Sequence, residues 1–288
     1  MTVGTTEVRP GIGSFPSPEA IRGRAGGENF SVASALLGRK TAHELLTIYD
    51  YARLVDQLGD AAPGDRAALL DLLEEEVDAA FTGTPRHPIM RALAETISAH
   101  RLPRDPFQRL IEANRRDQVR PEYETFAELV EYCQLSANPV GELVLHVFGS
   151  ASPTTVELSD DVCTALQLIE HWQDVGEDAA NGRIYLPAED RDRFGVSDDD
   201  LRSEHANSAL RRLLAFESER AADLLTSGRL LVAALRGRAR LAVAGYVGGG
   251  RAALAALADA DYDVLGGPVR ARRSDRARLT VRTLGGRW

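Results

Sequence analysis

Apolar residues recur every three or four positions along most of this chain, which is the spacing that places them on one face of an α-helix. In residues 29–59, for example, Leu45, Ile48 and Ala52 follow this spacing. The same pattern predicts further helices over residues 65–80, 87–100, 106–117, 125–148, 159–181, 208–227 and 229–260. No alternation of apolar and polar residues typical of a strand extends beyond a few positions. The pattern therefore predicts an all-α fold.

Residues that begin, bend or end helices divide this pattern. Pro139 removes a backbone donor and clashes with the preceding turn, so it predicts a kink within residues 125–148. Ser159 or Asp160 is expected to cap the following helix, and Gly182 to end it near residue 181. Gly228 is the expected break between the last two helices.

The two ends of the chain differ in composition from the middle. Residues 1–27 are rich in Gly, Pro, Ser and Thr and predict a flexible arm. Residues 269–288 are rich in Arg and predict a disordered basic tail, with contact to anionic lipid at a membrane surface as the alternative. Residues 28–268 are expected to form one helical domain, a bundle with a central cavity.

Composition narrows the class of protein further. A formal charge of −9 argues against a nucleic-acid binder, which needs a basic surface. The two cysteines are too few for a disulfide framework, which fits the reducing cytoplasm. The first residues do not resemble a secretory signal, and no run of about 18 apolar residues suggests a membrane span. We therefore expect a cytoplasmic protein, with peripheral membrane contact as an option.

Two of the predicted helices carry acids within otherwise apolar stretches. In the first, Arg53, Asp56 and Asp60 project from one side. In the second, Gln167, Glu170, Asp174 and Asp178 project from one side of the helix, and Glu177 lies at the edge of that side. Burying several carboxylates together is prohibitive unless cations compensate them, and Mg²⁺ commonly pairs carboxylates with substrate phosphates. The pattern indicates a magnesium–diphosphate site, although two amphipathic helices with solvated acids would show the same spacing.

Three segments resemble motifs of the squalene/phytoene synthase family. Residues 49–60, YDYARLVDQLGD, resemble its first aspartate-rich motif, and residues 166–187, which end in GRIYLP, resemble its second. Between them, residues 132–141, YCQLSANPVG, resemble its central tyrosine-cysteine motif. The three occur in the family's order. Residues 28–30 and the SANPVG run are most similar to the hydroxysqualene synthases of bacterial hopanoid biosynthesis.

This resemblance implies roles for particular residues. The magnesium ligands it implies are Asp56, Asp60, Asp174 and Asp178, with Glu170 and Glu177 beside them. The diphosphate-binding residues it implies are Arg53, Arg183, Tyr185 and Asn29, and a packing role is equally open for Tyr185. Arginine suits this task because its rigid fork donates paired hydrogen bonds to phosphate oxygens. Tyr132 and Gln167 are expected beside the reacting carbons.

The chain departs from the family pattern at several positions, among them Thr41 in place of an arginine and Ala61 in place of an acid. Gln57 stands where the first motif usually has its second aspartate, and Glu170 replaces the asparagine usual in the second motif. Gly250 stands where many relatives have a tyrosine. The missing ring would leave room for a water held by Tyr132 or Gln167, but tight helix packing explains a glycine equally well.

The resemblance implies an enzyme that converts presqualene diphosphate to hydroxysqualene by water addition, without a nicotinamide cofactor. The sequence leaves open whether a partner enzyme supplies presqualene diphosphate. One alternative is a head-to-head synthase that joins two farnesyl or geranylgeranyl diphosphates into squalene or phytoene. Another is a non-catalytic helical assembly or binding protein, which would be expected to have lost both acid clusters.

Overall fold

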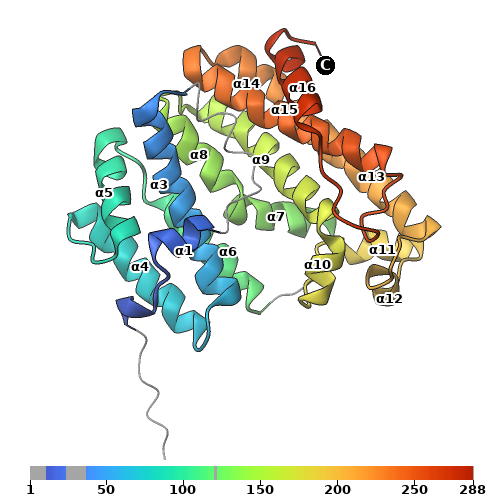
Figure 1. Ribbon diagram of the computed structural model, residues 1–288, viewed down its shortest axis with the longest axis horizontal. Coiled ribbons are helices and arrows are strands. Elements are labelled where there is room, and N and C mark those ends of the chain that lie inside the picture. The colour runs from blue at the N-terminus through green and yellow to red at the C-terminus, as the bar shows by residue number, and fades with distance from the viewer. Residues whose placement is uncertain (1–10, 24–36, 120–121, 288) are drawn as a thin grey trace, which may run out of the picture.

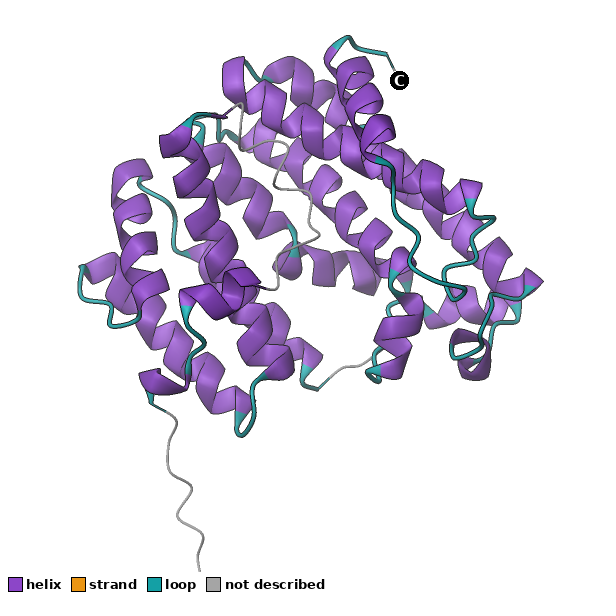
Figure 2. Ribbon diagram, viewed as in Figure 1, coloured by secondary structure: helices purple, strands orange, loops and turns teal. Residues whose placement is uncertain are grey.

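The computed structural model describes residues 11–23, 37–119 and 122–287. Over these ranges the regular elements are all helices (Figure 2), and the sole strand-like contact is an isolated bridge between Glu122 and Ile184. The prediction of an all-α fold is confirmed. The helices form two groups, each built around its own apolar core, and the groups meet along α8 and α9 (Figure 1).

The first group contains the N-terminal helices (Figure 1). Its elements are η1 (Ile12–Ser14), α1 (Pro18–Gly23), α3 (Arg39–Asp56), η2 (Gln57–Ala61), α4 (Arg66–Thr82), α5 (Pro88–His100), α6 (Asp105–Asp117) and α8 (Asn138–Val147). The helix boundaries follow local chemistry. Asp65 accepts a hydrogen bond from the backbone of Ala68 and caps α4, and Gly83 ends the same helix in the left-handed conformation.

The second group contains the remaining helices of the described residues. Its elements are α7 (Phe126–Ser136), α9 (Pro153–Gln173), α10 (Val175–Ala180), α11 (Ala188–Phe194), α12 (Asp198–Leu201), α13 (Ser208–Leu225), α14 (Gly228–Ala234), α15 (Gly237–Asp259) and α16 (Arg273–Leu284). Helix α9 lies at its centre and packs against α8, α13, α14 and α15. Its Leu168 and Trp172 are fully buried.

The central tyrosine-cysteine motif brings α8 against α9. A Cβ atom at Gly141 would lie 2.4 Å from the Sγ of Cys163 and 2.5 Å from the Oγ of Ser159, so only glycine allows this approach. Thr164 donates a hydrogen bond of 3.0 Å to the side chain of Asn138. The kink expected at Pro139 is a full break between α7 and α8. The motif therefore joins the two cores.

Two predicted boundaries of α9 are wrong. The helix begins well before Ser159 because Ser152 and Thr155 form a capping box at its start. It also does not continue to residue 181. It ends at Gln173, because the φ of −107° and ψ of 14° at Asp174 depart from helical values, and α10 begins immediately afterwards. Similarly, the helix expected over residues 229–260 is divided into α14 and α15.

The prediction of a disordered tail over residues 269–288 is wrong, because this segment contains α16. Leu279 and Thr283 of α16 are buried against α15. A Cβ atom at Gly248 would lie 2.6 Å from the backbone nitrogen of Thr280, so the two helix backbones approach closely. Small residues on α15 thus provide the packing surface that orders the segment.

Part of the predicted N-terminal arm is helical. Helix α1 packs on α3, and Arg22 donates hydrogen bonds of 3.0 and 3.1 Å to the buried carboxylate of Asp50. Residues 1–10 and 24–27 of the arm lie outside the described residues.

Helix α15 is, among the described helices, the one whose length and mean hydropathy of 1.4 would also suit a membrane span. In this structure it packs against α9, α13, α14 and α16. Its Arg251 donates a hydrogen bond of 3.1 Å to Thr283 of α16. The apolar composition of α15 is thus used for packing within the bundle.

Candidate active site

A cavity of about 240 Å³ opens between the two helix groups. The residues predicted from the motifs that line it are Asp56, Asp60, Tyr132, Gln167, Glu170, Asp174, Asp178, Arg183 and Tyr185. The lining residues that sequence patterns did not single out as site residues are Leu110, Asn114, Asp117, Ser136 and His171. Segments more than a hundred residues apart in sequence therefore contribute to one site.

The first acid pair lies where α3 changes into the π-helical turn η2. Asp56 is the last residue of α3, and Asp60 lies within η2. Gly59 permits this turn to touch α6, because a Cβ atom there would lie 2.0 Å from the Oδ1 of Asn114. Gln118 donates a hydrogen bond of 2.7 Å to the carbonyl of Gly59. These contacts fix the turn that presents Asp60 to the cavity.

The second acid set follows the end of α9. Glu170 lies on α9, Asp174 at the junction with α10, and Asp178 on α10. Burial raises the pKa of Asp174 above its usual value, and repulsion from Asp178 and Glu177 adds to this effect. Glu177 itself is exposed and does not line the cavity. Of the residues expected to bind metal, Glu177 is the one that does not line the cavity, although it lies close enough to Asp174 to repel its carboxylate.

Arg183 connects the two sides of the cavity. Its Nη1 atom lies 2.5 Å from the Oδ1 atom of Asp60. Burial disfavours the charged guanidinium, but the hydrogen bond with Asp60 and the nearby Asp117 outweigh this, so the pKa of Arg183 is raised. Arg53 lies 3.9 Å from Asp56 on α3 and is not among the lining residues. Asn29 lies outside the described residues.

Asp117, at the end of α6, contacts the side chain of Tyr132. The Tyr132 hydroxyl donates a hydrogen bond of 2.6 Å to its carboxylate. Burial raises the pKa of Asp117 to about 7, although Tyr132 and Arg183 oppose the shift. No motif identified this residue. The sequence did contain one sign of it. Asp117 lies in the last turn of α6, where the helix dipole disfavours an acid, so its presence there calls for another role.

Aromatic rings form one wall of the cavity. The rings of His171 and Tyr185 are stacked with centroids 3.7 Å apart, and the Tyr132 ring lies 5.7 Å from that of Tyr185. Burial lowers the pKa of His171, so its imidazole is neutral at pH 7. The packing role considered for Tyr185 is thus real, and the residue also lines the cavity. Aromatic faces attract cations, so this wall suits an electron-deficient carbon.

The cavity has the ligands that a hard divalent cation requires. Among the described residues, six carboxyl groups line it, from Asp56, Asp60, Asp117, Glu170, Asp174 and Asp178, and Arg183 contributes a guanidinium. Within the described residues, no three His, Cys, Asp or Glu side chains converge into a ready-made metal site. Mg²⁺ typically takes one or two carboxylates and completes its shell with phosphate oxygens and water. The donor set therefore fits Mg²⁺ bound together with a diphosphate.

The hypothesis that Gly250 leaves room for a water is wrong. A Cβ atom at this position would lie 2.6 Å from the Cδ2 atom of Leu166 and 3.2 Å from that of Leu225. The space of the missing side chain is filled by its neighbours. Gly250 allows α15 to pack closely against α9, as the packing alternative states.

Fold and cavity together define an all-helical protein suited to binding a polyanion with divalent cations. A family model described as squalene/phytoene synthase matches residues 24–282. The chain belongs to the squalene/phytoene synthase family and is an enzyme. Because the chain belongs to an enzyme family and retains both acid clusters, the alternative of a non-catalytic assembly or binding protein is not supported.

Named relatives fall into more than one branch of this family. The chain is 36% identical to a hydroxysqualene synthase from Rhodopseudomonas palustris, over 73% of this chain and 72% of the relative. It is 32% identical to a phytoene synthase from Arthrospira platensis, over 72% of each chain. The crystal structure of squalene synthase HpnC from Alicyclobacillus acidocaldarius is similar to it with a TM-score of 0.78, at 43% identity over 87% of this chain and 98% of that one.

Proposed function

We propose that this enzyme is a magnesium-dependent hydroxysqualene synthase that converts presqualene diphosphate to hydroxysqualene in the cytoplasm, as a step toward hopanoids. The observation that carries the proposal is the arrangement of Asp56 and Asp60 opposite Asp174 and Asp178 around one cavity, with Arg183 between them. Similarity to a hydroxysqualene synthase supports the choice of substrate.

In this proposal the acids and Arg183 act on the diphosphate end of the substrate. Mg²⁺ held by Asp56, Asp60, Asp174 and Asp178 would supply positive charge that favours departure of diphosphate. Arg183 would donate hydrogen bonds to the phosphate oxygens, exchanging Asp60 for the substrate. Breaking the carbon–oxygen bond places the electron pair on diphosphate and leaves a carbocation.

The aromatic wall would act on the carbon skeleton. Tyr132 would face the carbocation and stabilise it through its ring electrons, and Tyr185, stacked on His171, would support this wall. Gln167, which also lines the cavity, would hold the attacking water. Water adds to the cation, and the proton that it loses is taken up by diphosphate or solvent, so no hydride donor is consumed. A partner enzyme would supply presqualene diphosphate.

A second candidate is the head-to-head synthase reaction on farnesyl or geranylgeranyl diphosphate, because a phytoene synthase is also among the relatives. The first motif lacks one carboxylate at Gln57, but Glu170 adds one to the cavity in the second motif, so the charge count does not separate the two reactions. The first proposal is preferred because identity to the hydroxysqualene synthase, 36%, exceeds identity to the phytoene synthase, 32%.

Incubation with presqualene diphosphate and Mg²⁺ in oxygen-18 water, with and without NADPH, tests this function. The proposal predicts hydroxysqualene that carries the label whether or not NADPH is present. It also predicts slower turnover of farnesyl and geranylgeranyl diphosphates. Squalene formed only with NADPH, or efficient conversion of two farnesyl or geranylgeranyl diphosphates, would contradict it.

A further inference from the structure

One edge of the molecule exposes large apolar side chains on three adjoining helices. Leu230 on α14 is 61% exposed, Leu241 on α15 is 39% exposed, and Val281 on α16 is 68% exposed. Helix α14 packs against both α15 and α16, and the three helices form the upper edge in Figure 1. Among the described residues, five large apolar side chains are exposed, and three of them lie on these helices.

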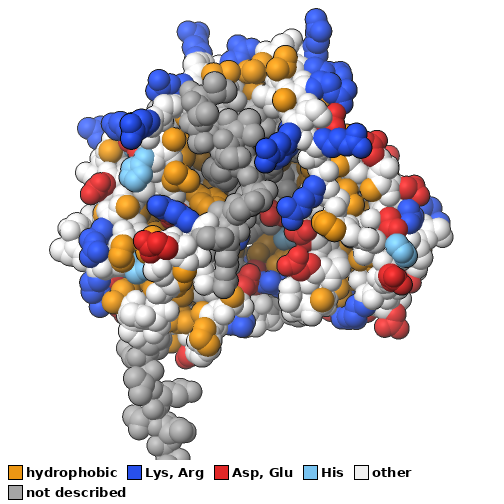
Figure 3. All heavy atoms as spheres, viewed as in Figure 1, with side chains coloured by type: hydrophobic (Ala, Val, Ile, Leu, Met, Phe, Trp, Pro, Cys, Tyr) orange, Lys and Arg blue, Asp and Glu red, His pale blue; other side chains and the backbone are white. Residues whose placement is uncertain are grey.

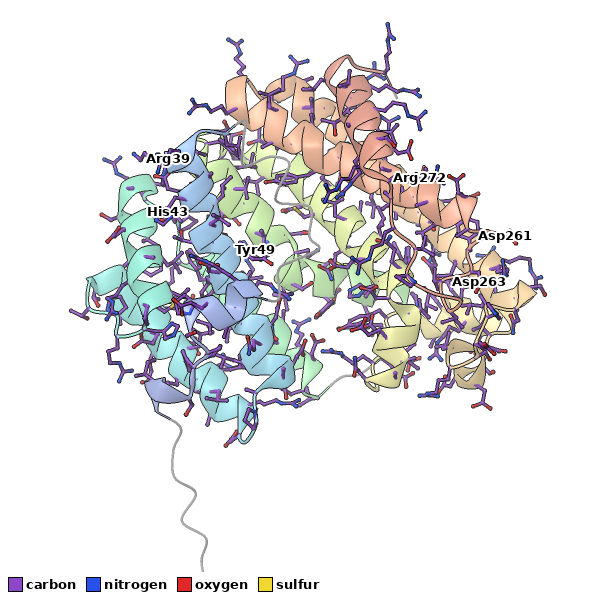
Figure 4. The ribbon with its side chains drawn as sticks, in the orientation of Figure 1. Arg39, His43, Tyr49, Asp261, Asp263 and Arg272 are labelled. Atoms are coloured by element: carbon purple, nitrogen blue, oxygen red, sulfur yellow. The ribbon has the colours of Figure 1, made fainter. Side chains whose placement is uncertain are left out.

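Arginines accompany these apolar residues. Residues 228–288 contain twelve arginines and four aspartates, a formal charge of +8, against −17 for residues 1–227. Lys and Arg side chains project along the upper edge in Figure 3. Three of the four aspartates lie at the far end of α15, where Figure 4 labels Asp261 and Asp263. The fourth, Asp275, pairs with Arg278 at 3.0 Å.

Several of these arginines keep their charge available. Within the described part of the chain, the exposed side chains of Arg229, Arg236 and Arg282 form no ion pair. Arg240 donates a hydrogen bond of 2.9 Å to the carbonyl of Leu284, which joins α15 to α16 without neutralising the guanidinium. The α14–α16 face, defined by Arg229, Leu230, Arg236, Leu241, Val281 and Arg282, is therefore both cationic and apolar.

We propose that the α14–α16 face binds the surface of an anionic phospholipid membrane. Guanidinium groups pair with lipid phosphates, and the exposed Leu and Val side chains enter the acyl boundary between them. A nucleic-acid site would leave those apolar side chains in water, and the net charge of −9 would oppose approach of DNA or RNA. An anionic membrane attracts only this basic face and repels the acidic remainder of the protein, so the protein would bind in one orientation. This inference stands whichever isoprenoid diphosphate is the substrate.

Co-sedimentation of the full chain with vesicles tests the proposal. Vesicles of equal parts phosphatidylcholine and phosphatidylglycerol should bind the wild-type protein, and pure phosphatidylcholine should not. The triple variant Arg229→Glu/Arg236→Glu/Arg282→Glu should lose about a hundredfold or more in partition coefficient, since each arginine near such a surface is worth roughly fivefold. Leu230→Ser/Val281→Ser should lose about tenfold through lost apolar insertion.

A matched control carries the same change in net charge elsewhere. Arg66, Arg91 and Arg202 are exposed and donate only to backbone carbonyls in the described structure. They belong to α4, α5 and the end of α12, elements that lie away from the upper edge in Figure 1. Their combined replacement by Glu should lower binding far less than the first triple variant, with all proteins matched by circular dichroism. Equal loss in both triple variants, no preference for phosphatidylglycerol, or stronger binding to duplex DNA than to vesicles would overturn the proposal.

Discussion

Glu217 on α13 holds its proton at unusually high pH. Its side chain is fully buried, and it lies beside the buried Asp190 of α11. Burial raises the pKa of Glu217 to about 8, with Asp190 adding to the shift and Arg220 opposing it. Arg220 donates a hydrogen bond of 2.6 Å to Asp190. At neutral pH a protonated Glu217 can donate a hydrogen bond to Asp190, and this contact joins α13 to α11. Arg220 then balances only the negative charge of Asp190.

This arrangement predicts that the free energy of unfolding depends on pH. Because the pKa of Glu217 rises from 4.5 to about 8 on folding, its contribution is fully present below pH 4.5 and is lost as the pH rises through 8. Urea unfolding of Glu217→Gln should lack this decline, which is of the order of 5 kcal/mol over the full range. The free energy of unfolding of Glu219→Gln, an exposed position on the same helix, should decline with pH as it does in the wild type. Parallel profiles for wild type and Glu217→Gln would contradict the account.

Asp117 illustrates which site residues sequence patterns can reveal. Residues such as Asp56 and Asp174 belong to motifs with helical spacing, so both the spacing and the family resemblance identify them. Asp117 stands alone near the end of α6, and it becomes a site residue only because α6 and α7 bring it within 2.6 Å of Tyr132. Glu177 is the converse case. It belongs to the motif, yet on α10 it does not line the cavity.

At the scale of elements, close helix packing positions the site. Gly59 sets the π-helical turn η2 against α6, and Gly141 sets α8 against α9. Helical periodicity predicted which elements exist because each helix buries one apolar stripe. It could not predict that α16 is ordered or that Gly250 packs against Leu166, because both depend on contacts with residues distant in sequence.

Substitution of Gly59 by alanine tests the role of the turn. The added methyl group would overlap the side chain of Asn114, so the free energy of unfolding should fall by about 1–2 kcal/mol despite the better helix propensity of alanine. The double variant Gly59→Ala/Asn114→Ala should show a smaller loss for the Gly59 change. Gly245→Ala, which meets no atom within 4 Å, is the control and should be neutral or stabilising. Equal effects of the two single glycine variants in urea unfolding would rule out the steric explanation.

At the scale of the whole molecule, charge is divided between two regions with different tasks. Six carboxyl groups of the described residues line the cavity between the two cores, and arginines lie on the α14–α16 face. The acids suit cations that accompany a diphosphate, and the arginines suit an anionic surface. The family resemblance anticipated the first region from its motifs. The second depends on α16, whose folding places Val281 and Arg282 next to α14 and α15.

The central claim is that the opposed acids of the cavity promote departure of diphosphate. Its most direct test is the rate of diphosphate release from presqualene or farnesyl diphosphate, whichever turns over faster, with Mg²⁺ and with EDTA. We predict that EDTA abolishes release and that Mg²⁺ restores it. Asp174→Asn should lower the rate by about a hundredfold or more, whereas Glu177→Gln, outside the cavity, should stay close to wild type. Undiminished release in EDTA, or from the Asp174→Asn protein, would contradict the account.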